Sequence, residues 1–248
     1  MKRVLSYGVI FFLLMLFPVC LMAADNIAEA DKLFNLGGIE NYKQTIELLE
    51  KELSANPDSY EANWKCARAY REYGNDAKKK KVEGWKKICA EYGKKGMQYA
   101  LKAIELNPDR PDGHYYYGLN VGIYSDGVSI FTALSEGLKD KTQSSFEKTY
   151  EIDKTYKEAG PMLSLGRFWA VLPWPMRDRD KSLQFYREYQ ATKYFADNLE
   201  AHFYIGELLY QIGGKENKAE AKGLLEKAAQ SEDPYFADQA KDLLGKIK

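Results

Sequence analysis

A small residue recurs at one position of a repeated helical pattern, and this recurrence constrains the fold more than any other feature. Apolar residues follow one another at spacings of three and four, the period of an amphipathic helix, and strand-like alternation does not persist. The recurring small residues are Ala67, Gly118, Gly166 and Gly206. A side chain larger than a methyl group at a helix crossing would push the two helices apart. The pattern therefore predicts an all-α chain of helix pairs that cross at these four positions.

A second phrase identifies the kind of repeat. Ala103–Pro108 reads Ala-Ile-Glu-Leu-Asn-Pro, and Ser54–Pro57 and Tyr150–Asp153 are weaker copies of it. The chain thus resembles a tetratricopeptide-repeat protein, whose unit of about 34 residues contains two helices and often ends in such a phrase. The resemblance implies a helical-hairpin repeat array, an α-solenoid.

The repeats are longer than usual. The spacings between the four small residues are 51, 48 and 40, so each unit is expected to carry an insertion between its paired helices. The insertions are expected at residues 75–92, 124–137 and 172–180. Residues 26–56 are predicted to form an opening helix pair, and the segment from Pro234 onward a terminal capping helix. One repeat domain of about four to five helix pairs is thus expected over residues 25–248.

The start of the chain has the layout of a secretory signal peptide. A basic pair precedes an almost wholly apolar run that ends at Ala23, and polar sequence begins at Asp25. We expect residues 1–24 to be a cleaved leader and the mature chain to be exported to the periplasm. An uncleaved N-terminal membrane anchor is the alternative, because the run is long enough to span a bilayer. Cys20 lacks the preceding small residue of a lipid-attachment site.

Further stretches resemble one branch of the repeat superfamily. They are Trp64–Tyr70, His114–Asn120, Glu136–Lys141 and Leu165–Trp169, the last running into Leu172–Pro175. Together they are similar to the T-component (TatT) family of TRAP transporter systems. That resemblance implies an apolar channel, a periplasmic substrate-binding protein as partner and a hydrophobic small ligand. The alternative is a general cell-envelope assembly scaffold that holds peptide segments in a concave groove. Homo-oligomerisation is left open.

Composition and motifs argue against an enzyme. Without Lys2 and Arg3 of the leader, 34 basic residues stand against 36 acidic ones, so no long-range field would attract nucleic acid. Catalytic motifs, cofactor-binding loops and zinc-type spacings are not found. The two histidines, His114 and His202, share one repeat position, which favours helix packing over metal binding. The mature chain has two cysteines, Cys66 and Cys89, so one disulfide bridge between them is possible.

Two rows of side chains flank the crossing residues and form the predicted binding face. The row three positions before holds Trp64, Tyr115, Leu163 and Phe203, and the row one position after holds Arg68, Leu119, Arg167 and Glu207. Trp174 and Tyr210 complete the candidate set. The aromatic residues would supply apolar contact, and Arg68 and Arg167 would pair with a carboxylate of a ligand or an acidic partner segment. The alternative is repeat-to-repeat packing, with the arginines paired internally.

Two segments have both a structural and a functional interpretation. Lys78–Lys81, followed by Trp85, Lys86 and Lys87, is either a solvated loop or a contact for anionic lipid headgroups. Leu172–Pro175 is a stiff elbow, since each proline fixes its own backbone angle. Trp174 within it either plugs the array or stands at a rim as a contact residue. Asp178 or Asp180 is expected to cap the helix that follows.

Overall fold

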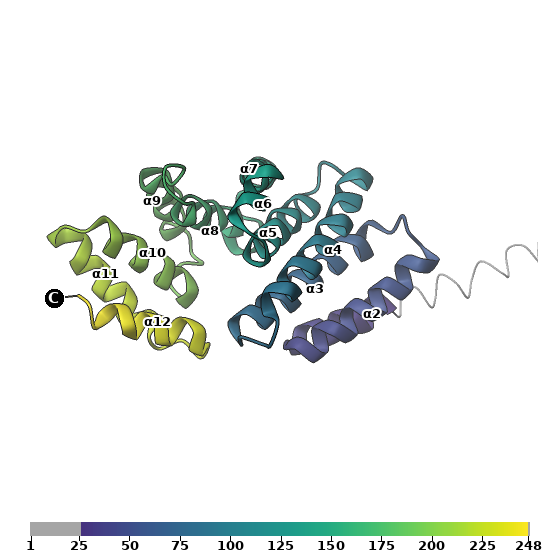
Figure 1. The fold of residues 1–248 in the computed structure, drawn as a ribbon, viewed down its shortest axis with the longest axis horizontal. Coiled ribbons are helices and arrows are strands. Elements are labelled where there is room, and N and C mark those ends of the chain that lie inside the picture. The colour runs from purple at the N-terminus through teal and green to yellow at the C-terminus, as the bar shows by residue number, and fades with distance from the viewer. Residues whose placement is uncertain (1–25, 248) are drawn as a thin grey trace, which may run out of the picture. The chain divides into compact units, whose positions relative to one another are not determined.

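The computed structural model describes residues 26–247, and every regular element in this range is a helix (Figure 1). The chain divides into two compact units, Met1–Glu136 and Gly137–Lys248, here called unit 1 and unit 2. The predicted leader lies outside the described residues. Within them, no helix combines the length and the apolar character needed to cross a membrane.

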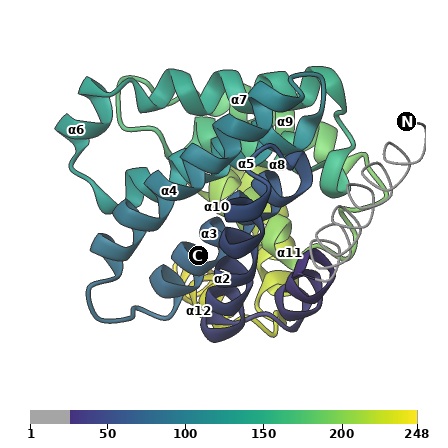
Figure 2. The ribbon, with the colours of Figure 1, turned by 90° about the vertical axis from the view of Figure 1, so that its right-hand side faces the viewer.

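In unit 1, α2 packs on α3, α3 on α4 and α4 on α5, each helix on the next one in the chain (Figure 2). A helical stretch over residues 26–36 is followed by α2 (Ile39–Ala55), α3 (Tyr60–Lys79), α4 (Trp85–Leu106), α5 (Pro111–Gly127) and the short α6 (Ile130–Ser135). Ala30 of the first stretch shares a buried cluster with Leu49 of α2 and Tyr70 of α3. The predicted opening helix pair over residues 26–56 is therefore confirmed.

Glycines bring α4 unusually close to α5. A Cβ atom on Gly93 would lie 2.5 Å from the backbone nitrogen of Tyr124, and one on Gly96 would lie 2.0 Å from Oδ1 of Asn120. Asn120 is buried, and its Nδ2 donates to the carbonyl oxygen of Ala67 on α3 at 2.9 Å. The side chain of Asn120 thus ties α5 to α3, and glycine on α4 leaves room for it.

Unit 2 continues the pattern of helix pairs. Its helices are α7 (Leu138–Ile152), α8 (Tyr156–Val171), α9 (Arg179–Gln190), α10 (Leu199–Ile212), α11 (Lys215–Ala228) and α12 (Pro234–Leu244). Proline at the first position of α12 suits a helix start, where its missing N–H costs nothing. Phe236 of α12 packs on Phe203 of α10 with ring centroids 5.7 Å apart, so the predicted capping helix is confirmed.

The predicted helix crossings are borne out where close contacts define them. A Cβ atom on Gly166 of α8 would lie 2.3 Å from the ring of Tyr186 on α9, and one on Gly206 of α10 would lie 2.9 Å from Leu225 on α11. Ala67 and Gly118 are both buried. The two glycines of unit 2 therefore hold their helix pairs at a separation that a larger residue would not allow.

The first predicted insertion is wrong in form. Residues 75–79 continue α3 and residues 85–92 belong to α4, so the connection is only residues 80–84. Small buried residues such as Ala77 and Cys89 let the two helices extend side by side. The basic run accordingly begins on α3 rather than in a loop. The other two predicted insertions agree better with the structure. The short helix α6 lies within residues 124–137, and residues 172–178 form a loop before α9. Asp178 caps α9 by accepting a hydrogen bond from the Lys181 N–H at 2.9 Å.

Both described cysteines are free and fully buried. Burial raises the pKa of the Cys66 thiol well above its usual value and that of Cys89 to about 11. Cys89 donates to the carbonyl oxygen of Gly74 at 3.5 Å. The two residues act as small protonated core side chains.

His202 is a packing residue of unit 2. Its ring stacks on Phe195 with centroids 4.3 Å apart, and Nδ1 lies 2.8 Å from the carbonyl oxygen of Asn198. A carbonyl only accepts, so Nδ1 carries the proton of the neutral ring. Nε2 is buried and has no hydrogen-bond partner among the described residues.

Stability is expected to fall in mild acid because of His202. Burial, reinforced by the Lys227 charge, lowers its pKa below 6.5 in the folded chain. The unfolded chain therefore binds the proton first as pH falls. The histidine contribution is intact above the unfolded pKa of about 6.5 and is lost progressively below it. Urea unfolding between neutral pH and pH 5 should show a smaller decline for His202→Gln than for the parent, and equal slopes would contradict this assignment.

Candidate binding surface

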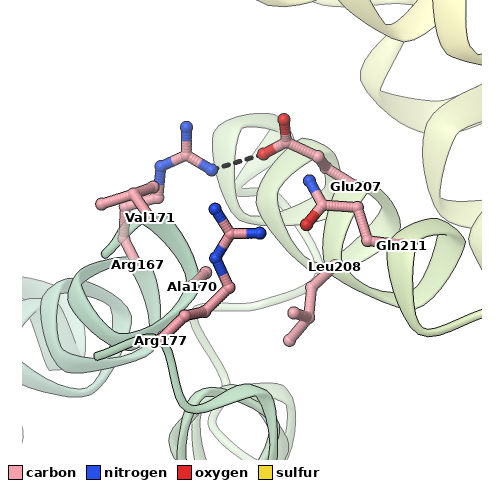
Figure 3. A pocket seen from close by; sticks show the side chains of 7 residues that line it. All are labelled: Arg167, Ala170, Val171, Arg177, Glu207, Leu208 and Gln211. Carbon is pink, nitrogen blue, oxygen red and sulfur yellow. Dashed lines mark hydrogen bonds and ion pairs between the residues drawn. The ribbon is translucent and has the colours of Figure 1, made fainter. Parts of the chain in front are cut away.

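A recess of about 170 Å³ lies between the end of α8 and the second half of α10 in unit 2 (Figure 3). The loop after α8 closes one side. The lining residues are Arg167, Ala170, Val171, Arg177, Glu207, Leu208 and Gln211. Ligand pockets for small molecules usually measure about 300–1,000 Å³. The recess is therefore of a size to receive one side chain of a partner.

Arg167 and Glu207 neutralise each other across the recess. The Arg167 guanidinium donates to the Glu207 carboxylate, as the dashed line in Figure 3 marks, and it lies 4.4 Å from the ring centroid of Tyr204. Burial raises the pKa of Tyr204, so its ring is neutral and offers a π face to the cation. The expectation that Arg167 waits for an external carboxylate is corrected, since its charge already has a partner in the next repeat.

Arg177 is the second arginine that lines the recess. Its Nε donates to the carbonyl oxygen of Leu172 at 2.9 Å, which anchors the side chain to the loop. Among the described residues it forms no ion pair. Figure 3 shows its guanidinium directed into the recess, toward the amide of Gln211. Arginine and a primary amide side by side form a donor set suited to a carboxylate.

The loop beside the recess presents a large apolar side chain. Trp174 is 88 % exposed and Val171 at the end of α8 is 51 % exposed. The Trp174–Pro175 peptide bond is cis. Of the two sequence-based alternatives for Trp174, the plug is therefore wrong, and its role as a contact residue stays a prediction.

In unit 1 the predicted row is largely engaged in packing. Nη2 of Arg68 lies 2.9 Å from Oδ1 of Asp31, and its guanidinium stacks 3.7 Å from the ring centroid of Phe34. Trp64 stacks on Tyr116 at 5.8 Å and also lies against Arg68. Arg68, like Arg167, is thus paired internally, which corrects the expectation that it is free for a partner.

The remaining candidates fall into two groups. Phe203 is only 1 % exposed because α12 covers it, so it belongs to the core and not to a binding face. Tyr115, Leu119 and Tyr210 are half-buried. Since the row runs through both units, its projection onto one continuous surface stays a prediction.

Five of the seven residues that line the recess were missed by sequence reasoning, because they lie outside the two offsets at which the repeat places binding residues. They are Ala170, Val171, Arg177, Leu208 and Gln211. The Pro-Trp-Pro segment was the available signal, since a rigid loop also fixes the side chains that follow it. Within residues 26–247, no three His, Cys, Asp or Glu side chains gather in a way that would hold a metal ion.

Sequence and structure comparisons place the chain among helical repeat proteins. The family model described as "Regulator of microtubule dynamics protein 1-3" matches residues 26–169, more than half of the chain. No curated protein sequence matches this chain. A crystal structure of TTC0263, a thermophilic TPR protein in Thermus thermophilus, is similar with a TM-score of 0.61 and 16 % identity, over 91 % of this chain and 98 % of that one.

A crystal structure of MamA protein is similar with a TM-score of 0.51 and 16 % identity, over 86 % of this chain and 93 % of that one. At such identities a likeness shows the fold alone. The chain is a helical repeat array of the tetratricopeptide type, as the sequence predicts.

Proposed function

The chain belongs to the family of regulator of microtubule dynamics proteins 1-3. We propose that it is a protein-interaction module whose unit 2 recognises an acidic segment of a partner. The observation that carries the proposal is Arg177, a guanidinium directed into a side-chain-sized recess without an ion-pair partner among the described residues. An aspartate, a glutamate or a chain-terminal carboxylate fits both the volume and the charge.

Neighbouring residues contribute to the proposed recognition in different ways. The Arg167–Glu207 pair is neutral overall and forms the wall of the recess, so it adds shape rather than net charge. Gln211 offers amide donors to a second carboxylate oxygen. Trp174 supplies a large exposed surface for an apolar residue near the acidic one, the kind of anchor that dominates protein interfaces.

Binding to paired peptides tests this function. An array would carry acidic peptides and the same peptides with Asn and Gln in place of Asp and Glu. Parent protein should prefer the acidic forms, and Arg177→Ala should weaken their binding by about tenfold or more, the usual worth of a charge-assisted hydrogen bond. Trp174→Ala should weaken both forms.

Arg179→Ala is the matched control, because Arg179 is exposed at the start of α9 and does not line the recess. It removes the same charge two residues farther along. If Arg179→Ala and Arg177→Ala bind acidic peptides equally well, recognition at the recess is wrong.

We propose further that the partner is the periplasmic substrate-binding protein of a TRAP-type uptake system. The leader-like residues 1–24 and the stretches similar to T-component proteins support this role. The family description names microtubules, but an exported chain would meet envelope proteins instead. The rival proposal is a cell-envelope assembly scaffold that binds peptide segments of several proteins.

Affinity capture from periplasmic extract separates the two roles. Recovery of one substrate-binding protein by the parent, and its loss with Arg177→Ala, supports the transport role. Recovery of several unrelated envelope proteins supports the scaffold. The hydrophobic ligand that the T-component resemblance implies would appear as an added lipid-like mass in the native mass spectrum of the purified protein.

A further inference from the structure

The short helix α6 exposes three large apolar side chains to solvent. Phe131 is 80 % exposed, Leu134 52 % and Ile130 50 %, and none of the six residues of α6 is buried. A single exposed apolar residue is ordinary, but three on one helical turn and a half are a patch. Ser129 caps the helix by accepting from the Thr132 N–H at 3.1 Å, so the apolar residues are held in a defined helix.

The chain on both sides of α6 is held against neighbouring helices, which limits where α6 can lie. A Cβ atom on Gly127, just before α6, would lie 2.4 Å from the backbone nitrogen of Ala90 and from the carbonyl oxygen of Lys86. Just after α6, Oε1 of Glu136 accepts a hydrogen bond from Tyr124 of α5 at 3.0 Å. Three residues of chain place Ile130 within about 11 Å of Gly127. The patch therefore stands beside the first turns of α4.

The same end of unit 1 carries the densest basic segment of the described chain. Residues 78–87 hold six lysines and one acidic residue. Lys78 at the end of α3 pairs with Asp126 at the end of α5 at 2.6 Å, which brings this segment to the end of α5 that leads into α6. Lys81, Lys86 and Lys87 are exposed. Figure 2 shows both on the left of the view, α6 above and the turn from α3 to α4 below, with the start of α4 between them.

We propose that this end of unit 1 binds an anionic membrane surface. Apolar side chains that enter the headgroup boundary and lysines that meet lipid phosphates are the two elements of interfacial binding. Neither element suffices alone. Lysines alone would bind the membrane only by charge, and salt would weaken that binding. The apolar patch alone would not select anionic lipid. Phe131 and its neighbours on α6 insert, and Lys81, Lys86 and Lys87 contact the headgroups. This surface lies in unit 1 and is independent of the peptide recess in unit 2.

Vesicle co-sedimentation tests the proposal with the chain from Asp25 onward, which contains every described residue. One set of vesicles contains phosphatidylglycerol and phosphatidylethanolamine, and the other only phosphatidylcholine. The parent should sediment with the first set and not with the second. Phe131→Ser and Lys86→Glu should each lower the bound fraction severalfold at moderate salt, with unchanged helical circular dichroism.

Two control variants match these changes at the other end of the helices. Leu101 is 44 % exposed on α4, sixteen residues beyond Trp85 or about 24 Å along the helix, so Leu101→Ser should bind as the parent does. Lys51 is exposed on α2 close to its junction with α3, so Lys51→Glu should also bind normally.

The proposal is overturned if the parent does not distinguish the two vesicle types, or if Phe131→Ser binds as well as Leu101→Ser. It is also overturned if the parent is a dimer that Phe131→Ser converts to a monomer while vesicle binding is unchanged, since the patch would then be an interface between copies.

Discussion

Replacing Gly93 by alanine is expected to lower the free energy of unfolding by roughly 1–3 kcal/mol, the usual cost of overpacking. The added Cβ atom would lie 2.5 Å from the backbone nitrogen and 2.8 Å from the Cα atom of Tyr124. These are main-chain atoms, so relief requires a shift of α5 as a whole. Such a shift would also strain the hydrogen bond from Asn120 to the carbonyl oxygen of Ala67.

Gly122→Ala is the matched control on α5. A Cβ atom there meets nothing within 4 Å, and the residue is exposed. The same chemical change should therefore stabilise the protein by up to about 1 kcal/mol through helix propensity. Urea denaturation followed by circular dichroism should move the two midpoints in opposite directions. Midpoints that move together would show that the close approach of α4 and α5 does not limit the packing.

Local spacing explains why so much of the fold was predictable. Helices depend on apolar residues a few positions apart, and their crossings depend on a small residue where two helices meet. These local features predict the opening pair, the capping helix and the crossings at Gly166 and Gly206. The same reasoning missed the small residues on α4, Gly93 and Gly96. The repeat pattern places its small residue on the first helix of each pair, whereas here the second helix also packs closely against the helix that follows it.

Charge pairing was less predictable because partners come from distant repeats. Arg68 pairs with Asp31, 37 residues earlier, and Arg167 pairs with Glu207, 40 residues later. The sequence offers many acids at helix faces, and only the packed structure selects among them. Phe203 shows the same limit, since its burial depends on α12 folding back over α10. The recess was hidden for a related reason: Arg177 lies in the loop and Gln211 on another helix, and only the fold brings them together.

Replacing Gly166 by leucine is expected to lower the free energy of unfolding by roughly 1–3 kcal/mol. A Cβ atom on Gly166 would lie 2.3 Å from Cδ1 and Cε1 of Tyr186, a fully buried ring in the core of unit 2. Because the ring is fully buried, it has little space to turn. The crossing is also held by Ser182, whose Oγ donates to the Gly166 carbonyl oxygen at 2.7 Å. Gly223→Leu on α11 is the matched control, since a Cβ atom there meets nothing within 4 Å.

A double-mutant cycle identifies Tyr186 as the origin of that cost. Tyr186→Ala alone should destabilise by about 3–5 kcal/mol, as large aromatic-to-alanine changes in cores do, because it leaves a cavity against α8. In the double variant the leucine at position 166 fills part of that cavity and no longer meets the ring. Its loss of stability should therefore be smaller than the sum of the two single losses by at least about 0.5 kcal/mol, beyond the scatter expected for independent sites. Chemical denaturation of the parent, both single variants and the double variant measures this coupling. Additive losses would mean that Gly166 and Tyr186 do not share one packing site, and the assignment of Gly166 as the crossing residue of α8 and α9 would be wrong.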